Sequence, residues 1–292
     1  MRKGIKIGLW FLCICMGYCQ NIFHNVEKNI KDAIKKLGSE EPALIDEGRE
    51  ALLFYGSLAT DELINALESE KIEVRFLACQ LLGEIRDRKA IPYLLLLFDK
   101  KVKVLSSISS CAAESLGLLQ AKEAIPKLIE SLDSDDAELK YNALKSLGYL
   151  HATEAIDKIK KLLSDNSATY FDGLIRAQAI RTLELLGPES AIKELKKLLT
   201  DTAIEKFTGK QVRYYAVRAL QGITDLDFGN IDAEDEPARL EEIYNKWVEW
   251  AKKTDKKEES GEKKEEDPLK KLKELLPPDG KNMPENKNNE GK

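Results

Sequence analysis

The chain has 292 residues, of which 33% are charged and 43% hydrophobic, and its formal net charge is −5. Residues 20–251 hold 31 Lys and Arg against 40 Asp and Glu, a net charge of −9. A protein that binds nucleic acid through phosphate contacts needs a net basic face, so this acidic body argues against nucleic-acid binding as a general function.

The first 19 residues have the layout of a secretory signal peptide. A basic start precedes an apolar run over residues 7–16, and Gly17 and Cys19 stand three and one residues before a cut ahead of Gln20. We therefore expect an exported protein, periplasmic, secreted or in the cell envelope. Two alternatives stay open: an uncleaved anchor, although a spanning helix needs about 20 apolar residues, and a lipoprotein attached through Cys19. Membrane association is expected only in these two cases.

Two segments precede the regular part of the chain. Residues 21–37 are expected to form an amphipathic helix, because their apolar side chains recur at helical spacing. Residues 43–68 are predicted to be a degenerate first repeat that keeps Ala51 and Leu63. A polar, atypical terminal repeat is what a stack of repeats needs to cover its open apolar end.

A helix hairpin then recurs at spacings of 34, 31, 36 and 37 residues. Five residues before each repeat's anchor position stands an alanine, and one residue before it stands a leucine. Such offsets define one helical face, and an alanine column indicates that helix backbones approach closely there. The anchors are Gly83, Gly117, Gly148, Glu184 and Gln221, the alanines are Ala78, Ala112, Ala143, Ala179 and Ala216, and the leucines are Leu82, Leu116, Leu147, Leu183 and Leu220.

Each of the first four second helices is followed, seven residues after its anchor, by an Ala-Ile pair that opens the next helix, as at Ala124-Ile125. Pro92 and Pro126 fall in the first turn of two opening helices, where a missing N–H is tolerated. Asp135 is expected to cap the second helix of the central repeat. One hairpin cannot close a core alone, so the sequence predicts an all-α fold, an α-solenoid of about five to six stacked hairpins.

This pattern resembles the HEAT-like repeat family in its short bacterial form, the type found in bilin lyases. The matching residues are the Ala-Ile-Pro opener, Leu132-Asp133, and an apolar-basic pair before the alanine column; the third copy departs from that pair with Ile108-Ser109. The resemblance covers roughly residues 40–225. It implies the fold and leaves the activity open, because such a fold hosts many functions. The basic members of the pair are Arg75, Lys140, Arg176 and Arg213.

That basic column has two interpretations. It could form a ladder that binds anions, or its members could bond turn carboxylates of the same or the adjacent repeat. Two interpretations also apply to the extra residues of the longer repeats, residues 165–172 and 200–211. Insertions in a solenoid map to one side, which is often the binding side, but neutral loop drift would produce them as well.

The C-terminal part is expected to close the stack. A loop over residues 222–229 precedes a helix predicted over residues 237–251, whose Trp247 and Trp250 are expected to pack as a cap. Residues 252–292 carry 12 Lys and 11 Asp and Glu with little apolar content, so they are expected to be a disordered tail. A leucine-containing island, residues 269–276, could form two helical turns on binding something.

The sequence offers no catalytic or metal-binding constellation. Neither His24 nor His151 has a ligand partner three or four residues on, so the iron-binding hydroxylase branch of the resembled family is not expected. Cys79 and Cys111 are predicted to be buried thiols, too far apart for a disulfide. The acidic runs 133–136 and 225–227 could bind calcium, but a capping turn explains the first, and the second lacks the Gly and the terminal Glu of a calcium loop. We therefore expect no cofactor, no metal and no enzymatic activity.

The function predicted on these grounds is an exported, non-enzymatic scaffold for protein–protein interaction. Its alternatives are an enzyme or accessory subunit of the bilin-lyase kind and a surface lipoprotein adhesin. The expected partner is a protein, whose acidic segment would lie along the concave side lined by the opening helices. The residues of this predicted opening-helix surface are Tyr93, Leu96, Lys127, Lys158, Lys160, Lys161, Lys196 and Lys197.

Overall fold

The structure is a computed structural model that describes residues 24–98, 106–170, 172–232 and 236–260. Contacts divide the chain into two compact units, Met1–Trp247 and Val248–Lys292. The predicted signal peptide and the leucine-containing island lie outside the described residues. Within the described residues, no helix combines the length and the apolar character needed to cross a membrane.

Helices of the first unit pair into six hairpins within the described residues, which confirms the predicted all-α solenoid. The first hairpin joins a helix over residues 24–37 to α2 (Pro42–Tyr55). The other five are α3 (Thr60–Ala66) with α4 (Ile72–Ile85), α5 (Ile91–Phe98) with α6 (Ser106–Leu118), α7 (Ile125–Ser131) with α8 (Ala137–Tyr149), α9 (Ile156–Lys161) with α10 (Ile175–Leu186), and α11 (Ile192–Lys196) with α12 (Val212–Thr224).

The predicted first repeat, residues 43–68, was wrongly placed. Its first half forms α2, the second helix of hairpin one, and its second half forms α3, the opening helix of hairpin two. The contact that decides this lies at Gly48 in α2, where an added Cβ would lie 2.8 Å from the carbonyl oxygen of Ala33. Helix 24–37 and α2 therefore pack directly against each other.

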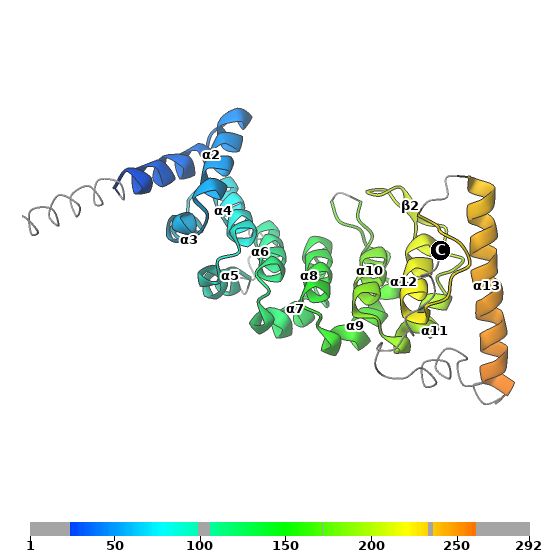
Figure 1. Cartoon of the computed structure of the whole chain (residues 1–292). Coiled ribbons are helices and arrows are strands. Elements are labelled where there is room, and N and C mark those ends of the chain that lie inside the picture. Colours follow the sequence, from blue (N-terminus) through cyan, green and yellow to red (C-terminus); the bar gives the residue numbers. More distant parts are fainter. Residues whose placement is uncertain (1–23, 99–105, 171, 233–235, 261–292) are drawn as a thin grey trace, which may run out of the picture. The chain divides into compact units, whose positions relative to one another are not determined.

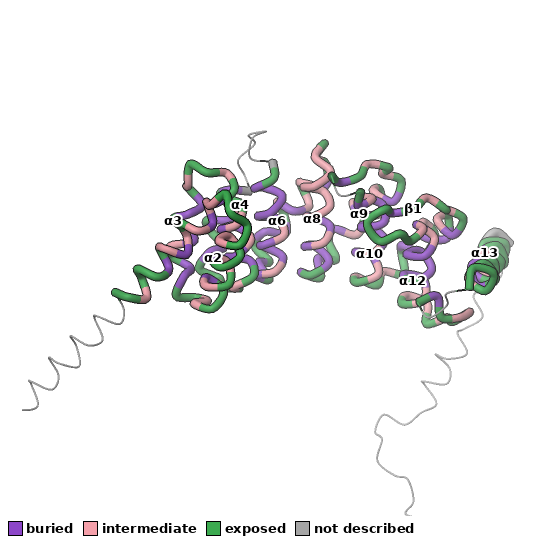
Figure 2. The backbone as a smooth tube through the Cα atoms, turned by 90° about the horizontal axis from the view of Figure 1, so that it is seen from above, coloured by how far each residue is buried: buried purple, intermediate pink, exposed green. Residues whose placement is uncertain are grey.

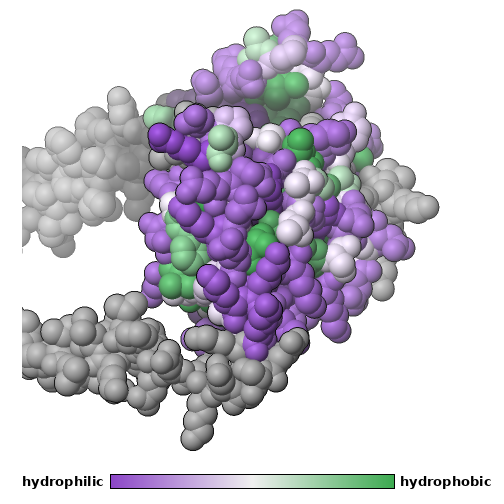
Figure 3. Space-filling view, turned by 90° about the vertical axis from the view of Figure 1, so that its right-hand side faces the viewer, coloured by the Kyte–Doolittle hydropathy of each residue, from purple (hydrophilic) through white to green (hydrophobic). Residues whose placement is uncertain are grey.

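The alanine and leucine columns are confirmed as the centre of the stack. All ten side chains named for these columns are 0% exposed. Figure 1 shows the second helices α6, α8, α10 and α12 side by side, with α7, α9 and α11 in a second layer, and Figure 2 shows where the buried residues lie along them. By contrast, hydrophilic residues predominate on the face in Figure 3, where hydrophobic ones form separate patches.

Each regular opening helix is introduced by a short 3-10 turn that ends on a buried alanine. Pro92 and Pro126 are the second residues of α5 and α7, as predicted. The turns are Arg88–Ala90, Lys122–Ala124, Thr153–Ala155 and Glu189–Ala191, and each terminal alanine is 0% exposed.

Neighbouring second helices meet through a glycine and a hydroxyl. A Cβ added to Gly83 in α4 would lie 2.8 Å from the Cα of Ser115 in α6. The Ser115 hydroxyl donates to the backbone carbonyl of Cys79 at 2.9 Å, and both groups are buried. The glycine thus lets the two helices approach closely. The serine hydroxyl can then hydrogen-bond to a backbone carbonyl of the neighbouring helix.

The same contact recurs at the next two interfaces between second helices. Each hydroxyl stands two residues before the anchor of its own helix and bonds the carbonyl four residues before the anchor of the preceding one. Ser146 stands opposite Gly117 and donates to Ala113 at 2.8 Å, while Thr182 stands opposite Gly148 and donates to Leu144 at 3.0 Å.

The interface between α10 and α12 uses a different contact. Glu184 replaces the glycine, and Ala219 replaces the hydroxyl residue at the matching position of α12. Arg218 instead donates to Glu184 at 3.0 Å across this interface. The glycine and the hydroxyl are therefore lost together.

The N-cap of the central second helix differs by one residue from the prediction. Asp136, not Asp135, caps α8, because its Oδ1 accepts from the backbone N–H groups of Glu138 and Leu139. The hydroxyl of Ser134 accepts from the N–H of Asp136 at 3.1 Å, and this turn places Asp136 at the helix start. The acidic run 133–136 thus contains a cap.

The last helix, α13 (Pro237–Ser260), begins where predicted and ends nine residues after the predicted Ala251. Residues 252–260, expected to be disordered, are helical; they contain neither Gly nor Pro. Within the first unit, Trp247 is 0% exposed and its ring lies 4.8 Å from that of Phe228, as expected for cap packing. The second unit is described only over the end of α13, and the rest of the predicted tail lies outside the described residues.

We predict that Gly117→Ala destabilises the protein by about 1–3 kcal/mol or more, because the new methyl group would overlap Ser146 in a packed interface. Its Cβ would lie 2.6 Å from the Ser146 Cβ and 2.9 Å from its Cα. Gly222→Ala is the matched control, since a Cβ there meets nothing within 4 Å. In that exposed helical position, alanine should raise the free energy of unfolding by up to about 1 kcal/mol. Urea unfolding of the two variants measures both values, and equal stabilities would contradict the interface.

Candidate functional site

The structure divides the predicted opening-helix surface into exposed and covered parts. Tyr93 and Leu96 are 44% and 65% exposed, and Lys161 and Lys197 are exposed. Lys196 differs from the expectation, because it is only 9% exposed. Its side chain therefore does not belong to an open binding surface.

The remaining lysines of this surface are half-buried, namely Lys127, Lys158 and Lys160. The last two form ion pairs with neighbouring acidic residues. Lys158 Nζ lies 2.6 Å from Asp133 Oδ2 in the preceding repeat, and Lys160 Nζ lies 2.9 Å from Asp157 Oδ1. Lys127 is half-buried and also makes an interaction. The lysine-rich stretch is thus partly neutralised within the protein.

At three of its four positions the basic column bonds a carboxylate of the next part of the stack, either in the following repeat or, for Arg213, on α13. Lys140 lies 2.6 Å from Asp165, Arg176 lies 3.0 Å from Asp201, and Arg213 lies 2.7 Å from Glu241. Burial would by itself raise the pKa of Asp165, but hydrogen bonds from Lys140 and Ser167 outweigh it and lower that pKa. These positions link repeats, as the structural interpretation of the column predicted.

Both inserted loops fold back on themselves. In the first, Ala168 and Leu174 form an antiparallel bridge. In the second, β1 (Ile204–Glu205) pairs antiparallel with β2 (Lys210–Gln211). Lys206 of this hairpin lies 3.2 Å from Asp172 of the first loop. The two insertions are therefore neighbours, although about 30 residues separate them in the sequence.

A buried carboxylate fixes the β1–β2 hairpin to the second helices. Glu205 is 0% exposed, and Arg181 of α10 donates to its Oε1 at 2.6 Å. Tyr215 of α12 donates to its Oε2 at 2.6 Å, and Thr208 of the hairpin donates to the same oxygen at 2.9 Å. Arg181 also donates to the hydroxyl of Tyr141 in α8 at 3.1 Å. This cluster ties one loop to three helices.

Charged and aromatic groups of this cluster influence one another. The guanidinium of Arg181 lies 4.8 Å from the centre of the Tyr215 ring. Burial and the hydrogen bond to Glu205 raise the pKa of Tyr215 well above its ordinary value. Burial also raises the pKa of Tyr141, against an opposing effect of Arg181. Both phenols therefore keep their protons through the physiological range.

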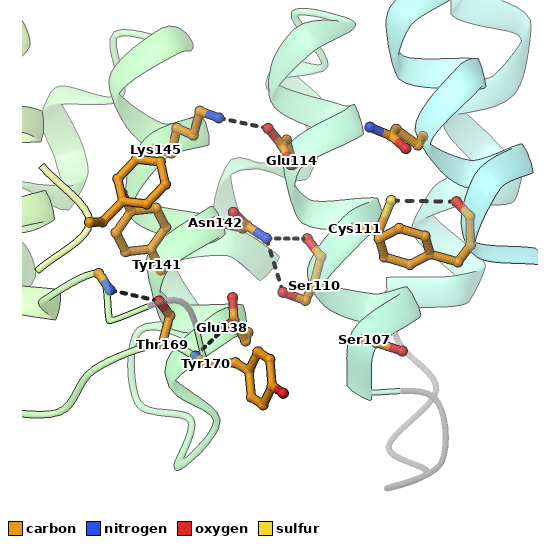
Figure 4. Close-up of a pocket in the computed structure, with 14 residues that line it drawn as sticks. Ser107, Ser110, Cys111, Glu114, Glu138, Tyr141, Asn142, Lys145, Thr169 and Tyr170 are labelled. Carbon is orange, nitrogen blue, oxygen red and sulfur yellow. Dashed lines mark hydrogen bonds and ion pairs between the residues drawn. The ribbon is translucent and has the colours of Figure 1, made fainter. Parts of the chain in front are cut away.

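The second helices α4, α6 and α8 and the two inserted loops together line a pocket of about 550 Å³ (Figure 4). Among the described residues, the opening helices contribute none to its lining. Its aromatic members come from four separate elements, namely Phe76 from α4, Tyr141 from α8, Tyr170 from the first loop and Phe207 from the hairpin. Phe76, Tyr170 and Phe207 are 38%, 88% and 69% exposed, so the pocket opens to solvent.

Polar side chains form the base of the pocket between these rings. Asn142 donates through Nδ2 to the backbone oxygen and the hydroxyl of Ser110, at 3.2 and 3.0 Å. Lys145 lies 2.6 Å from Glu114. Glu138 accepts from the backbone N–H of Tyr170 at 2.6 Å, which anchors the first loop to α8. Figure 4 shows Glu138 between Asn142 and Tyr170.

The two cysteines are buried free thiols, as predicted. A hydrogen bond with Cys111 and burial raise the pKa of Cys79, and Cys111 lines the pocket. Across the described part of the chain, no group of three or more His, Cys, Asp or Glu side chains could hold a metal ion.

The pocket was not predicted from the sequence. The only sequence signal for it was the position of the two insertions, for which a binding side was one of two interpretations. Its helical residues stand three, six, seven and ten positions before the anchors, outside the alanine and leucine columns that recur in the sequence.

Comparison with known proteins concerns the repeats. A family model described as HEAT repeats matches residues 60–139 and 125–206, which together span just over half of the chain. No curated protein matches the sequence.

Three solved structures illustrate the similarity. The complex of CpcE and CpcF of phycocyanin lyase from Nostoc sp. PCC7120 is 22% identical over 75% of this chain and 94% of its own, with a TM-score of 0.45. Computationally designed armadillo repeat proteins for modular peptide recognition are 18% identical over 66% and 99%, with a TM-score of 0.43. Human deoxyhypusine hydroxylase in complex with glycerol is 16% identical over 78% and 96%, with a TM-score of 0.38. Similarities this low carry no argument about function.

We predict that stability falls as the pH rises above about 10, the ordinary pKa of tyrosine. Because the pKa of Tyr215 is higher in the folded than in the unfolded state, the folded state holds its proton longer. This contribution is complete below the unfolded pKa and is lost as the pH rises from there toward the folded pKa. Urea unfolding at pH 8 and pH 11 should show a smaller loss for Tyr215→Phe than for the parent. An equal loss would contradict the role of Tyr215.

Proposed function

This chain belongs to the HEAT repeat family, and we propose that it is a non-enzymatic scaffold whose second-helix pocket binds another protein. The observation that supports this most directly is the convergence of Phe76, Tyr170 and Phe207 around one open pocket. Aromatic side chains are enriched among the residues that contribute most to binding at protein interfaces. Exposed aromatic groups gathered at one site also have a cost in water that a partner would remove.

The arrangement of the loops supports the same proposal. Loops that carry binding residues lose less conformational entropy on binding when the free protein already holds them in place. Here Glu138 holds the first loop, and the Glu205 cluster holds the hairpin that carries Phe207. The pocket is thus built before any partner arrives.

The opening-helix surface is the competing location. Its apolar end, Tyr93 and Leu96, is exposed, but Lys196 is buried and Lys158 and Lys160 are paired with acidic residues. An acidic segment would therefore meet fewer open positive charges there than the sequence predicts. The second-helix pocket offers more exposed aromatic area and is the location that we favour.

We predict that Tyr170→Ala combined with Phe207→Ala removes the proteins that the tagged full-length chain captures in its native cells. Both side chains are largely exposed, so their loss should leave the fold intact. Tyr93→Ala combined with Leu96→Ala is the matched control on the opening helices, and it should leave capture unchanged. Quantitative mass spectrometry of the two variants against the parent decides between the surfaces. Loss of capture only in the control pair would place the site on the opening helices.

We propose, independently, that the protein is exported. The support is the basic start, the apolar run and the small residues before Gln20. N-terminal sequencing of the protein from its native cells should begin at Gln20. A chain that starts at Met1 and is recovered from the cytoplasm would contradict export, and a lipid on Cys19 would identify the lipoprotein alternative.

A further inference from the structure

We infer that the second-helix pocket receives an arginine side chain of the partner protein. This inference rests on the proposed function, because it names the chemistry of the partner at that same site. It assigns Glu138 as the carboxylate that meets the guanidinium and the surrounding aromatic rings as the walls that stack on it. The partner segment in this pocket is then basic, whereas the segment expected on the opening-helix surface is acidic.

The charge of the pocket is the first support. Three charged side chains line it, Glu114, Glu138 and Lys145. Glu114 and Lys145 compensate each other across 2.6 Å. Glu138 accepts from a neutral backbone N–H and forms no ion pair with the cationic side chains of the described residues. One negative charge is therefore left for a ligand.

The aromatic rings are the second support. A cation is attracted to the face of an aromatic ring, and a planar guanidinium can stack on it as well. The rings of Tyr141, Tyr170 and Phe207 line the same pocket as Glu138. A carboxylate among aromatic rings suits a cationic group with an apolar stem better than it suits an anion or a purely apolar group.

The polar atoms at the base favour arginine over lysine. The guanidinium presents five N–H donors in one plane, whereas an ammonium is a compact charge with three. Asn142 uses its Nδ2 atom as the donor to Ser110, so its Oδ1 atom is an acceptor in the same pocket lining as Glu138. An arginine can therefore donate to the carboxylate and the amide oxygen together.

The wider field of the protein acts in the same direction. Residues 20–251 carry a net charge of −9, which attracts a basic segment from a distance and repels an acidic one. The preference for a basic partner thus comes both from one carboxylate in the pocket and from the body around it. Added salt should weaken both effects.

Binding of labelled octapeptides to the full-length chain tests the inference. The probes are fluorescein-labelled peptides of four Ser-Arg, four Ser-Lys or four Ser-Glu units, followed by fluorescence polarisation. We expect the arginine peptide to bind more tightly than the lysine peptide, and the glutamate peptide to bind least. Glu138→Gln should weaken binding of the arginine peptide by about tenfold or more, since it removes a charged hydrogen-bond acceptor.

Two further variants complete the test. Glu130→Gln makes the same change at an exposed position of α7 in the same repeat, outside the pocket lining, and should leave binding unchanged. Glu138→Gln keeps an amide oxygen for the N–H of Tyr170, so the loop should stay anchored. Tyr170→Ala, at a position that is 88% exposed, should weaken arginine binding without affecting the fold.

Equal affinities of the arginine and glutamate peptides, or unchanged affinity in Glu138→Gln, would overturn the inference. So would equal losses in Glu138→Gln and Glu130→Gln, which would reflect net charge alone. The proposed function is judged separately by cellular capture with the Tyr170 and Phe207 variant. If that variant loses its partners while the peptides show no preference for arginine, the pocket binds a protein and only the arginine assignment fails.

Discussion

The stack of second helices depends on one contact, a side-chain hydroxyl that bonds the backbone of the preceding helix beside a glycine. At the first of these interfaces, Ser115 donates to Cys79 while Gly83 removes the methyl group that would keep the helices apart. A buried hydroxyl without a partner would cost more than its bond gains, so the two residues act together. The pocket follows from this contact, since its residues on α4, α6 and α8 face one opening only while these helices stay in register.

The core was readable from the sequence because its residues recur. Ala143 and Leu147 have equivalents in the other four hairpins from α3–α4 to α11–α12, and all of them are buried. The hydroxyl column was less visible, since it comprises only Ser115, Ser146 and Thr182 and ends where Glu184 replaces the glycine. The first hairpin was misassigned for a related reason. It lacks the regular opener, so only the packing of Gly48 against Ala33 shows which helix is which.

The site was harder to predict because its residues do not recur. Glu205 reaches Arg181 across 24 positions through a hairpin whose conformation no periodic pattern encodes. The predicted lysines illustrate the opposite error. Lys196 was assigned to the binding surface although its column is of the buried type, and packing does cover it, while Lys158 is partly neutralised by Asp133 of the preceding repeat. Periodicity describes what all repeats share, whereas a binding site is formed by what distinguishes them.

The glycine–hydroxyl contact also bears on how such a chain can grow. The central helices carry both halves of it, because Ser115 and Gly117 lie on α6, and Ser146 and Gly148 lie on α8. A tandem duplication of the 31 residues that separate Gly117 from Gly148 would set a copied Ser146 against the original Gly148. The lengthened protein would reuse an interface that it already contains. After α10 this route closes, since Glu184 offers no glycine to a copied hydroxyl, and gene duplication would extend the molecule from its middle and not from its C-terminal repeat.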